Sequence, residues 1–246
     1  MVFFLYRKMA VAFLAALCYN NENYLPEQGE LVVEKKILFQ GDSITDCARD
    51  RTDFYGMGNG YANLVKASLG AAYPGEYAFI NRGISGNRSV DLYARIKIDF
   101  TNLCPDYASI YIGVNDAWHE INYKNGVDTA KFEKIYTMLI DEVMAACPNI
   151  KLMIIAPFVL EGTATCNTET CPDRWQRFKT DVAEKAAASK RIAEKYGLPL
   201  IELQPVFDKA CEKAPADYWT NDGVHPTACG HELIKKLWIE TFEKMK

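Results

Sequence analysis

The 246-residue sequence has no excess of basic residues. It carries 28 lysines and arginines against 32 aspartates and glutamates, for a formal net charge of -4, and its cations are scattered among acidic residues. Binding to the phosphate backbone of a nucleic acid depends on clustered Lys and Arg side chains. We therefore expect no nucleic-acid partner.

The usual metal-binding patterns are missing too. The chain has only three histidines, none of them in a His-x-x-x-His pair, and it has no paired Cys-x-x-Cys sets. These are the spacings at which zinc ligands commonly occur, so no metal is expected. The eight cysteines are irregularly spaced in a chain too long to depend on disulfides, and most are predicted to be buried thiols. A short bridge between Cys166 and Cys171 is feasible if the protein is exported.

No stretch rich in Pro, Gly or Ser divides the chain, which predicts one domain over residues 34–246 and an extension over residues 1–33. The apolar run Met9–Leu17 has the length of a signal-peptide core and is too short to span a bilayer. No clean cleavage site follows it, so a cytoplasmic location is favoured and secretion stays the alternative. The sequence does not indicate an oligomeric state.

Short apolar runs bounded by Gly, Pro, Asn or Asp alternate with stretches of helical periodicity. Phe132, Ile135, Leu139 and Val143 form one helical stripe, and a second helix is predicted to end at Gly197. Alternating strands and helices predict an α/β fold with a five-stranded parallel sheet between two helical layers. The predicted strands are Lys36–Gln40, Tyr77–Ile80, Tyr107–Ile112, Lys151–Ala156 and Leu200–Leu203.

Unusual polar segments follow these strands. Gly41-Asp42-Ser43 follows the first, Asn81–Asn87 the second and Gly113–Asp116 the third, while Asp222–His225 comes after the fifth and precedes the last helix. In open parallel sheets, the loops that leave the carboxyl ends of the strands converge at one edge. We therefore expect these four segments to meet.

Together the segments supply the groups that ester cleavage by a serine requires. Ser43 is the predicted nucleophile, His225 the base that takes its proton, and Asp222 the carboxylate that orients the base. The backbone N–H groups of Ser43 and Gly83 and the side-chain amide of Asn115 are the predicted oxyanion donors.

The four segments resemble the GDSL-type serine hydrolases, also called the SGNH superfamily, whose blocks centre on Ser, Gly, Asn and His. They fall here on Ser43, Gly83, Asn115 and His225, within Gly41–Asp46, Asn81–Arg88, Gly113–His119 and Asp222–Thr227. The resemblance is strongest to a bacterial carbohydrate-esterase-like branch and covers roughly residues 34–242. It implies a flavodoxin-like sheet and hydrolysis of acetyl or other short acyl esters, without metal or cofactor.

Four further residues are tentative contacts for substrate: Asp42, Trp118, His119 and Trp219. Packing competes with binding for Trp118 and His119, and Trp219 is expected to be either a substrate platform or an anchor for its loop. Asp116 is favoured as a structural hydrogen-bond acceptor over a catalytic acid. Arg82 and Arg88 are expected to form salt bridges with Asp42, Asp46 or Asp91.

The segment 158–172 follows the fourth strand, and loops of that length at this edge are often lids. Because it is polar, and because of the resemblance, acetyl groups on carbohydrates are the favoured substrate. Two alternatives stay open: a lysophospholipase- or thioesterase-like hydrolase of longer acyl esters, and a carbohydrate-binding relative without catalysis.

Overall fold

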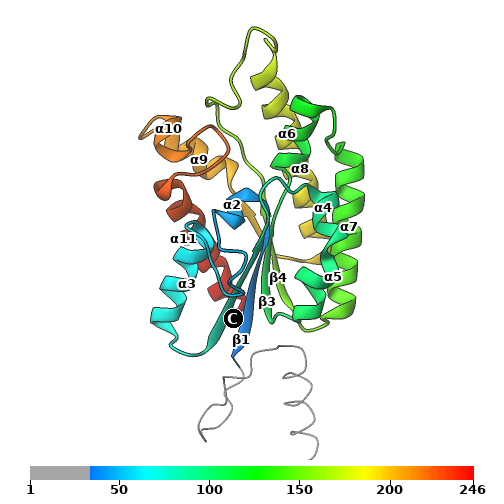
Figure 1. Ribbon diagram of the computed structural model, residues 1–246, viewed down its shortest axis with the longest axis vertical. Helices are drawn as coiled ribbons and strands as arrows, with labels where there is room; N and C mark the ends of the chain where they lie inside the picture. Colours follow the sequence, from blue (N-terminus) through cyan, green and yellow to red (C-terminus); the bar gives the residue numbers. More distant parts are fainter. Residues whose placement is uncertain (1–33) are drawn as a thin grey trace, which may run out of the picture. The chain divides into compact units, whose positions relative to one another are not determined.

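A computed structural model describes residues 34–246 as a parallel sheet between two layers of helices (Figure 1). The sheet has five strands in the order β2-β1-β3-β4-β5, every neighbouring pair parallel. The strands are β1 (Lys35–Gly41), β2 (Tyr77–Gly83), β3 (Tyr107–Tyr111), β4 (Lys151–Ala156) and β5 (Leu200–Glu202). This is the predicted α/β fold, and the five predicted strands match those observed within three residues at each end.

Helices follow the strands in the order that right-handed crossovers require. They are α2 (Ser43–Asp46), α3 (Tyr61–Ala72), α4 (Ser89–Ala94), α5 (Ile96–Asp99), the 3-10 turn η1 (Thr101–Leu103), α6 (Val114–Tyr123), α7 (Thr129–Ala146), α8 (Arg174–Tyr196), α9 (Gln204–Cys211), α10 (Ala216–Trp219) and α11 (Ala228–Met245). Figure 1 shows α3 and α11 over one face of the sheet and α4, α5 and α7 over the other.

Each face of the sheet has its own apolar core. Trp238 and Phe242 of α11 stack at 5.3 Å between ring centroids and pack with Phe39 of β1 on one face. On the other, Phe132 and Leu139 of α7 pack against strand side chains such as Ile110. Strands buried on both faces read as continuous apolar runs, which is why the sequence located them well.

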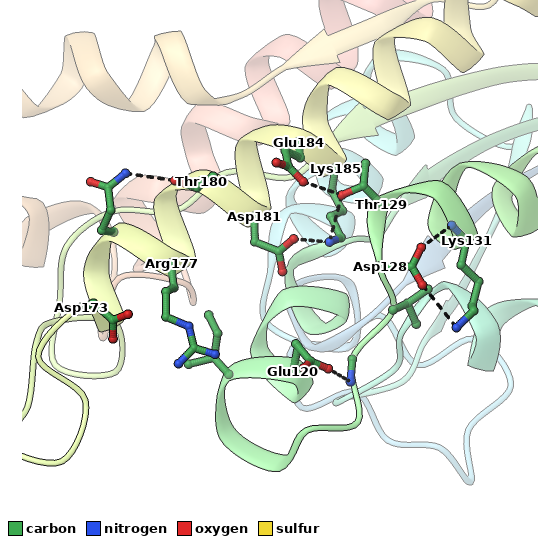
Figure 2. A pocket seen from close by; sticks show the side chains of 14 residues that line it. Glu120, Asp128, Thr129, Lys131, Asp173, Arg177, Thr180, Asp181, Glu184 and Lys185 are labelled. Atoms are coloured by element: carbon green, nitrogen blue, oxygen red, sulfur yellow. Dashed lines mark hydrogen bonds and ion pairs between the residues drawn. The ribbon is translucent and has the colours of Figure 1, made fainter.

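Lys185 is a buried cation that helical periodicity did not reveal. It lies in α8 with 1 % of its surface exposed, and its ammonium pairs with Asp181 and bonds to Thr129 Oγ1 at 3.3 Å. The group lines a cavity of about 680 Å³ between α6, α7 and α8. Figure 2 shows the side chains around it. A buried charge is tolerated only when it is paired in this way.

The predicted extension 1–33, including the signal-like run Met9–Leu17, lies outside the described residues, and the division into extension and domain stays a prediction. Among residues 34–246 there is no helix with the length and apolar character needed to cross a membrane. Cys166 and Cys171 are free thiols, and Cys171 Sγ contacts Asp173 Oδ1 at 3.5 Å.

Candidate active site

Ser43, His225 and Asp222 lie in one hydrogen-bonded line at the carboxyl edge of the sheet. Ser43 Oγ is 2.9 Å from His225 Nε2, and His225 Nδ1 is 2.7 Å from Asp222 Oδ2. The ionised carboxylate can only accept, so the neutral imidazole carries its proton on Nδ1 and leaves Nε2 to accept from the serine. The three side chains are arranged as a nucleophile, a base and an orienting acid.

The charges in this line support the same roles. Burial opposes ionisation of Asp222, but hydrogen bonds from the His225 ring and from the backbone N–H groups of His225 and Val224 lower its pKa to about 2. The hydrogen bond to Asp222 raises the pKa of His225 above its usual value, although burial of the ring opposes the rise. Asp222 is therefore ionised at neutral pH and makes His225 a stronger base.

Ser43 begins the four-residue helix α2, and Asp42 is the N-cap of this helix. Asp42 Oδ1 accepts a hydrogen bond from Ile44 N at 3.0 Å, as Asp commonly does at this position. The Asp42 side chain is completely buried, which raises its pKa to about 7. A buried side chain at this position does not fit the tentative substrate contact at Asp42, and its hydrogen bond to Ile44 holds the start of the Ser43 helix in place.

The turn that carries Asp222 and His225 is supported by the start of segment 158–172. Leu160 N donates to Gly223 O at 2.8 Å, and Ala164 N donates to Asp222 O at 3.0 Å. Gly162 lies so close to Asp222 that a Cβ there would overlap its backbone. The first residues of the predicted lid therefore hold the turn that carries Asp222 and His225 in place.

Asn115 is the second residue of α6 and reaches the loop after β2. Its Nδ2 donates to Asn87 O at 3.1 Å, and its side chain is almost buried. Asp116, next to it, accepts from Ser89 N at 3.1 Å and from Ser89 Oγ at 2.5 Å. Burial raises the Asp116 pKa to about 7. The contacts fit the structural acceptor that was favoured for Asp116, which ties α4 to α6.

Gly83 does not offer a free N–H group. Its nitrogen already donates to Asn81 Oδ1 at 2.8 Å, and a Cβ at this position would overlap the backbone of Asp46 in α2. The prediction that Gly83 is an oxyanion donor does not fit these contacts. Glycine is needed here because α2 packs directly on the end of β2.

Gly86, three residues later, has the free donor that Gly83 lacks. Within residues 34–246, its N–H has no hydrogen-bond acceptor, and its φ of +82° is a conformation that favours glycine. Ser85 on one side is bonded to Asp46 of α2, and Asn87 on the other is bonded to Asn115. Gly86 therefore lies between the nucleophile's helix and the asparagine amide. The sequence signal was present, since the motif Gly83-Ile84-Ser85-Gly86 contains two glycines.

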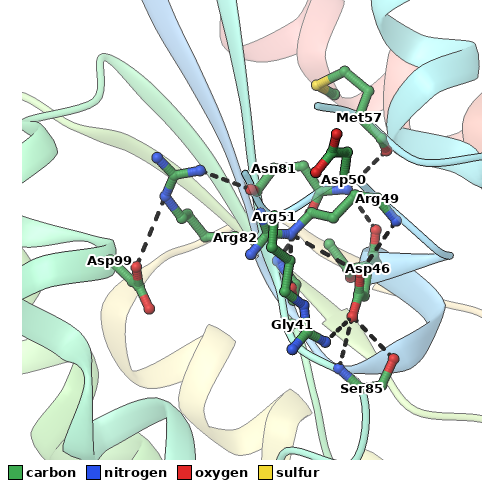
Figure 3. Close-up of polar contacts among 12 residues, drawn as sticks. Gly41, Asp46, Arg49, Asp50, Arg51, Met57, Asn81, Arg82, Ser85 and Asp99 are labelled. Carbon is green, nitrogen blue, oxygen red and sulfur yellow. Dashed lines mark hydrogen bonds and ion pairs between the residues drawn. The ribbon is translucent and has the colours of Figure 1, made fainter. Parts of the chain in front are cut away.

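An ionic cluster around Asp46 holds the Ser43 helix against the Gly86 loop (Figure 3). Asp46 Oδ2 accepts from Ser85 N at 3.0 Å and Ser85 Oγ at 2.9 Å, and it pairs with Arg51. Burial opposes ionisation of Asp46, but these hydrogen bonds lower its pKa. On the other side of β2, Arg82 pairs with Asp99 at 3.8 Å. The expected ion pair of Arg88 with Asp91 is present at 2.9 Å.

The aromatic residues named from the sequence separate into two groups. Trp118 lies beside the base, with 6.3 Å between its ring centroid and that of His225, and it packs on Phe178. His119, by contrast, packs edge-on against Tyr123 at 5.5 Å. Trp118 therefore lines the site, whereas His119 faces the exposed end of α6.

Trp219 has the contacts of an anchor. Its Nε1 donates to Ala210 O and Ala214 O, each at 3.1 Å, and its ring is packed on the core. These contacts fit the anchoring alternative that the sequence left open. In the described range, no group of three His, Cys, Asp or Glu side chains is placed to hold a metal ion.

The model of a known family, the GDSL-like lipase/acylhydrolase family, matches residues 39–233, a span that contains every residue of the line Ser43–His225–Asp222. The chain belongs to this family. It is therefore a carboxylic ester hydrolase of the GDSL (SGNH) type.

Similar proteins agree with this assignment. An acetylxylan esterase from Geobacillus stearothermophilus is 31% identical over 214 residues, which are 83% of this chain and 92% of that protein. The solved structure of an acetylxylan esterase from the same organism has a TM-score of 0.72 at 30% identity and covers 86% of this chain and 96% of its own. A putative GDSL-like lipase from Parabacteroides merdae has a TM-score of 0.79 at 33% identity, covering 87% and 97%.

Proposed function

We propose that this protein is a serine esterase that removes acetyl groups from carbohydrates through a covalent acyl-enzyme. The observation that carries the proposal is the 2.9 Å hydrogen bond from Ser43 Oγ to His225 Nε2, with Asp222 2.7 Å behind the ring. A nucleophile, base and orienter within hydrogen-bond reach are what acyl transfer requires. A carbohydrate-binding relative without catalysis would have no need of this arrangement.

In the first step, Ser43 Oγ attacks the ester carbonyl carbon while His225 Nε2 takes its proton. The oxyanion of the tetrahedral intermediate is held by the N–H groups of Ser43 and Gly86 and by Asn115 Nδ2. His225 then gives the proton to the departing sugar hydroxyl, which leaves Ser43 acetylated. Water, deprotonated by His225, attacks the acetyl carbonyl. The bond from Ser43 Oγ to the carbonyl carbon then breaks, His225 returns the proton to Ser43 Oγ, and acetate leaves.

Two observations support a small acyl group on a sugar. The protein is similar over most of its length to acetylxylan esterases. Trp118 beside His225 supplies an aromatic face next to the base. Segment 158–172 is rich in threonine.

An acyl chain-length series tests the substrate class. We expect kcat/KM on p-nitrophenyl esters to fall steeply beyond acetyl and propionyl, and acetate to be released from acetylated xylo-oligosaccharides. Ser43→Ala should lower kcat on these substrates by on the order of 10⁴ or more. A preference for chains of eight carbons or more would replace the acetyl assignment by that of a lipase-like hydrolase.

A further inference from the structure

Two thiols lie close together at the amino edge of the sheet, which is the edge opposite the Ser43 and His225 loops. Cys104 follows η1 and is exposed, and Cys147 caps the end of α7 with 7 % of its surface exposed. Their sulfurs share one acceptor, Thr101 O, at 3.2 Å from Cys104 Sγ and 4.0 Å from Cys147 Sγ. The charge of a Cys104 thiolate would act on Cys147, so the two thiols influence each other's ionisation.

We propose that Cys104 and Cys147 are a redox-sensitive pair that closes to a disulfide on meeting a small-molecule disulfide such as glutathione disulfide. Both sulfurs contact the same carbonyl oxygen, so they are close enough for rotation of the two side chains to bring them to bonding distance. Nothing in the ester hydrolysis uses either residue, so the proposal is independent of the proposed function.

The reaction is a double thiol–disulfide exchange. The Cys104 thiolate attacks one sulfur of glutathione disulfide, forms a mixed disulfide and releases one glutathione. The Cys147 thiolate then attacks the Cys104 sulfur, forms the internal disulfide and releases the second glutathione. The two protons lost by the cysteines end on the two glutathiones, and the two electrons reduce glutathione disulfide.

Exposure assigns the order of the two attacks. Cys104 can be reached from solvent, whereas Cys147 is covered and can be reached only by a sulfur held next to it, as Cys104 is. Burial raises the pKa of the Cys147 thiol to about 11, and the neighbouring Cys104 adds to the rise. Cys147 is therefore protected from direct oxidation and acts as the resolving thiol, faster at higher pH.

The disulfide would act on stability rather than on catalysis. Cys104 precedes β3 and Cys147 precedes β4, so the bond closes a loop that contains β3, α6 and α7. Ser43 and His225 lie outside this loop, and Asn115 lies in it at the opposite edge of the sheet. Closing a loop of this length restricts the unfolded chain, and we expect the Tm to rise by roughly 5–10 °C with kcat unchanged.

The test compares the full chain equilibrated with reduced glutathione and with glutathione disulfide. Mass spectrometry of a non-reducing digest should show the Cys104 peptide joined to the Cys147 peptide only after oxidation, and scanning fluorimetry should show the higher Tm. Cys104→Ser, at an exposed position, should abolish the joined peptide and the Tm shift. Cys211→Ser is the matched control, and it should retain both.

Two results would overturn the proposal. One is a stable glutathione adduct on Cys104 with Cys147 still reduced, which would show that the sulfurs cannot close. The other is a Tm shift of the same size in Cys104→Ser, which would place the effect at other thiols.

Discussion

His225 has to be neutral to take the proton of Ser43, and its hydrogen bond to Asp222 raises its pKa above the usual value near 6.5. The protonated ring cannot act as a base, so activity is lost as pH falls through this raised pKa. We expect the acid limb of kcat/KM on p-nitrophenyl acetate to have its midpoint above pH 6.5. A pH–rate profile from pH 4.5 to 9 measures it.

Asp222→Asn is the variant that separates the two effects of Asp222. It removes the charge that raises the His225 pKa, so the limb should move to lower pH, and it removes the acceptor that fixes the tautomer, so kcat should fall by roughly 10⁴. An unchanged limb midpoint in this variant would mean that a group other than His225 controls the pH dependence.

For single residues, the sequence was most informative where the type of residue and its position leave one chemical role. Ser43, Asp222 and His225, which the structure brings into one hydrogen-bonded line, were predicted because a strand-end serine and an Asp-x-x-His pair supply complementary groups. Gly83 and Gly86 could not be told apart, because only the backbone shows that one N–H is taken by Asn81 and the other is free. Burial of Asp42 was equally invisible in the sequence.

The contact of helix α2 with strand β2 depends on Gly83, whereas Gly86 is in open space. A Cβ at Gly83 would overlap the Asp46 backbone, but one at Gly86 meets no atom within 4 Å. We expect Gly83→Ala to displace α2 and lower kcat at least 10-fold. Gly86→Ala should cost only about 1–2 kcal/mol of backbone strain and keep most of the activity. Urea unfolding and initial rates on p-nitrophenyl acetate compare the pair. Equal losses in the two variants would contradict the assignment.

Helix α8 contains the buried Lys185 ammonium, which pairs with Asp181 of the same helix and bonds to Thr129 at the start of α7 (Figure 2). Removal of the acid leaves a buried ammonium with only the Thr129 hydroxyl and no paired charge, so Asp181→Ala should lower the free energy of unfolding by about 3 kcal/mol. Lys185→Met with Asp181→Ala removes the stranded charge and should recover much of the loss. Chemical denaturation measures all three proteins. No recovery in the double variant would show that the loss comes from packing.

The role of segment 158–172 could not be predicted from its length and position. Its position and polarity predicted a lid, but its first residues bond to Asp222 and Gly223 and have become part of the catalytic turn. The signal that could have indicated this is Gly162, which is required by close backbone approach.

On the scale of the whole molecule, the fold was predictable because each level of the sequence agrees with it. A parallel sheet covered on both faces is indicated by five apolar runs, by the helical stripes between them and by Gly197, the glycine that ends α8. Long-range ties were not predictable, because nothing local marks them. One example is His231 of α11, whose Nδ1 accepts from Tyr61 N at 3.1 Å and joins α11 to α3.

His231 should make global stability depend on pH. Burial lowers its pKa from 6.5 to about 4, so the folded state favours the neutral ring. The resulting stability is present above pH 6.5 and is lost as pH falls toward 4, by about 2–3 kcal/mol. His231→Gln keeps an acceptor for Tyr61 N but does not titrate, and we expect a shallower pH dependence in urea unfolding. A slope equal to that of the wild type would assign the dependence to other groups.

The central claim is that His225 activates Ser43 as a covalent nucleophile, and labelling with a fluorophosphonate tests it most directly. Intact-mass and peptide analysis of the folded wild type should show one adduct, on Ser43, formed in step with loss of acetylesterase activity. Ser43→Ala should take no label, and His225→Ala should label far more slowly. Wild-type protein that hydrolyses acetyl esters at full rate while Ser43 stays unlabelled would contradict the mechanism.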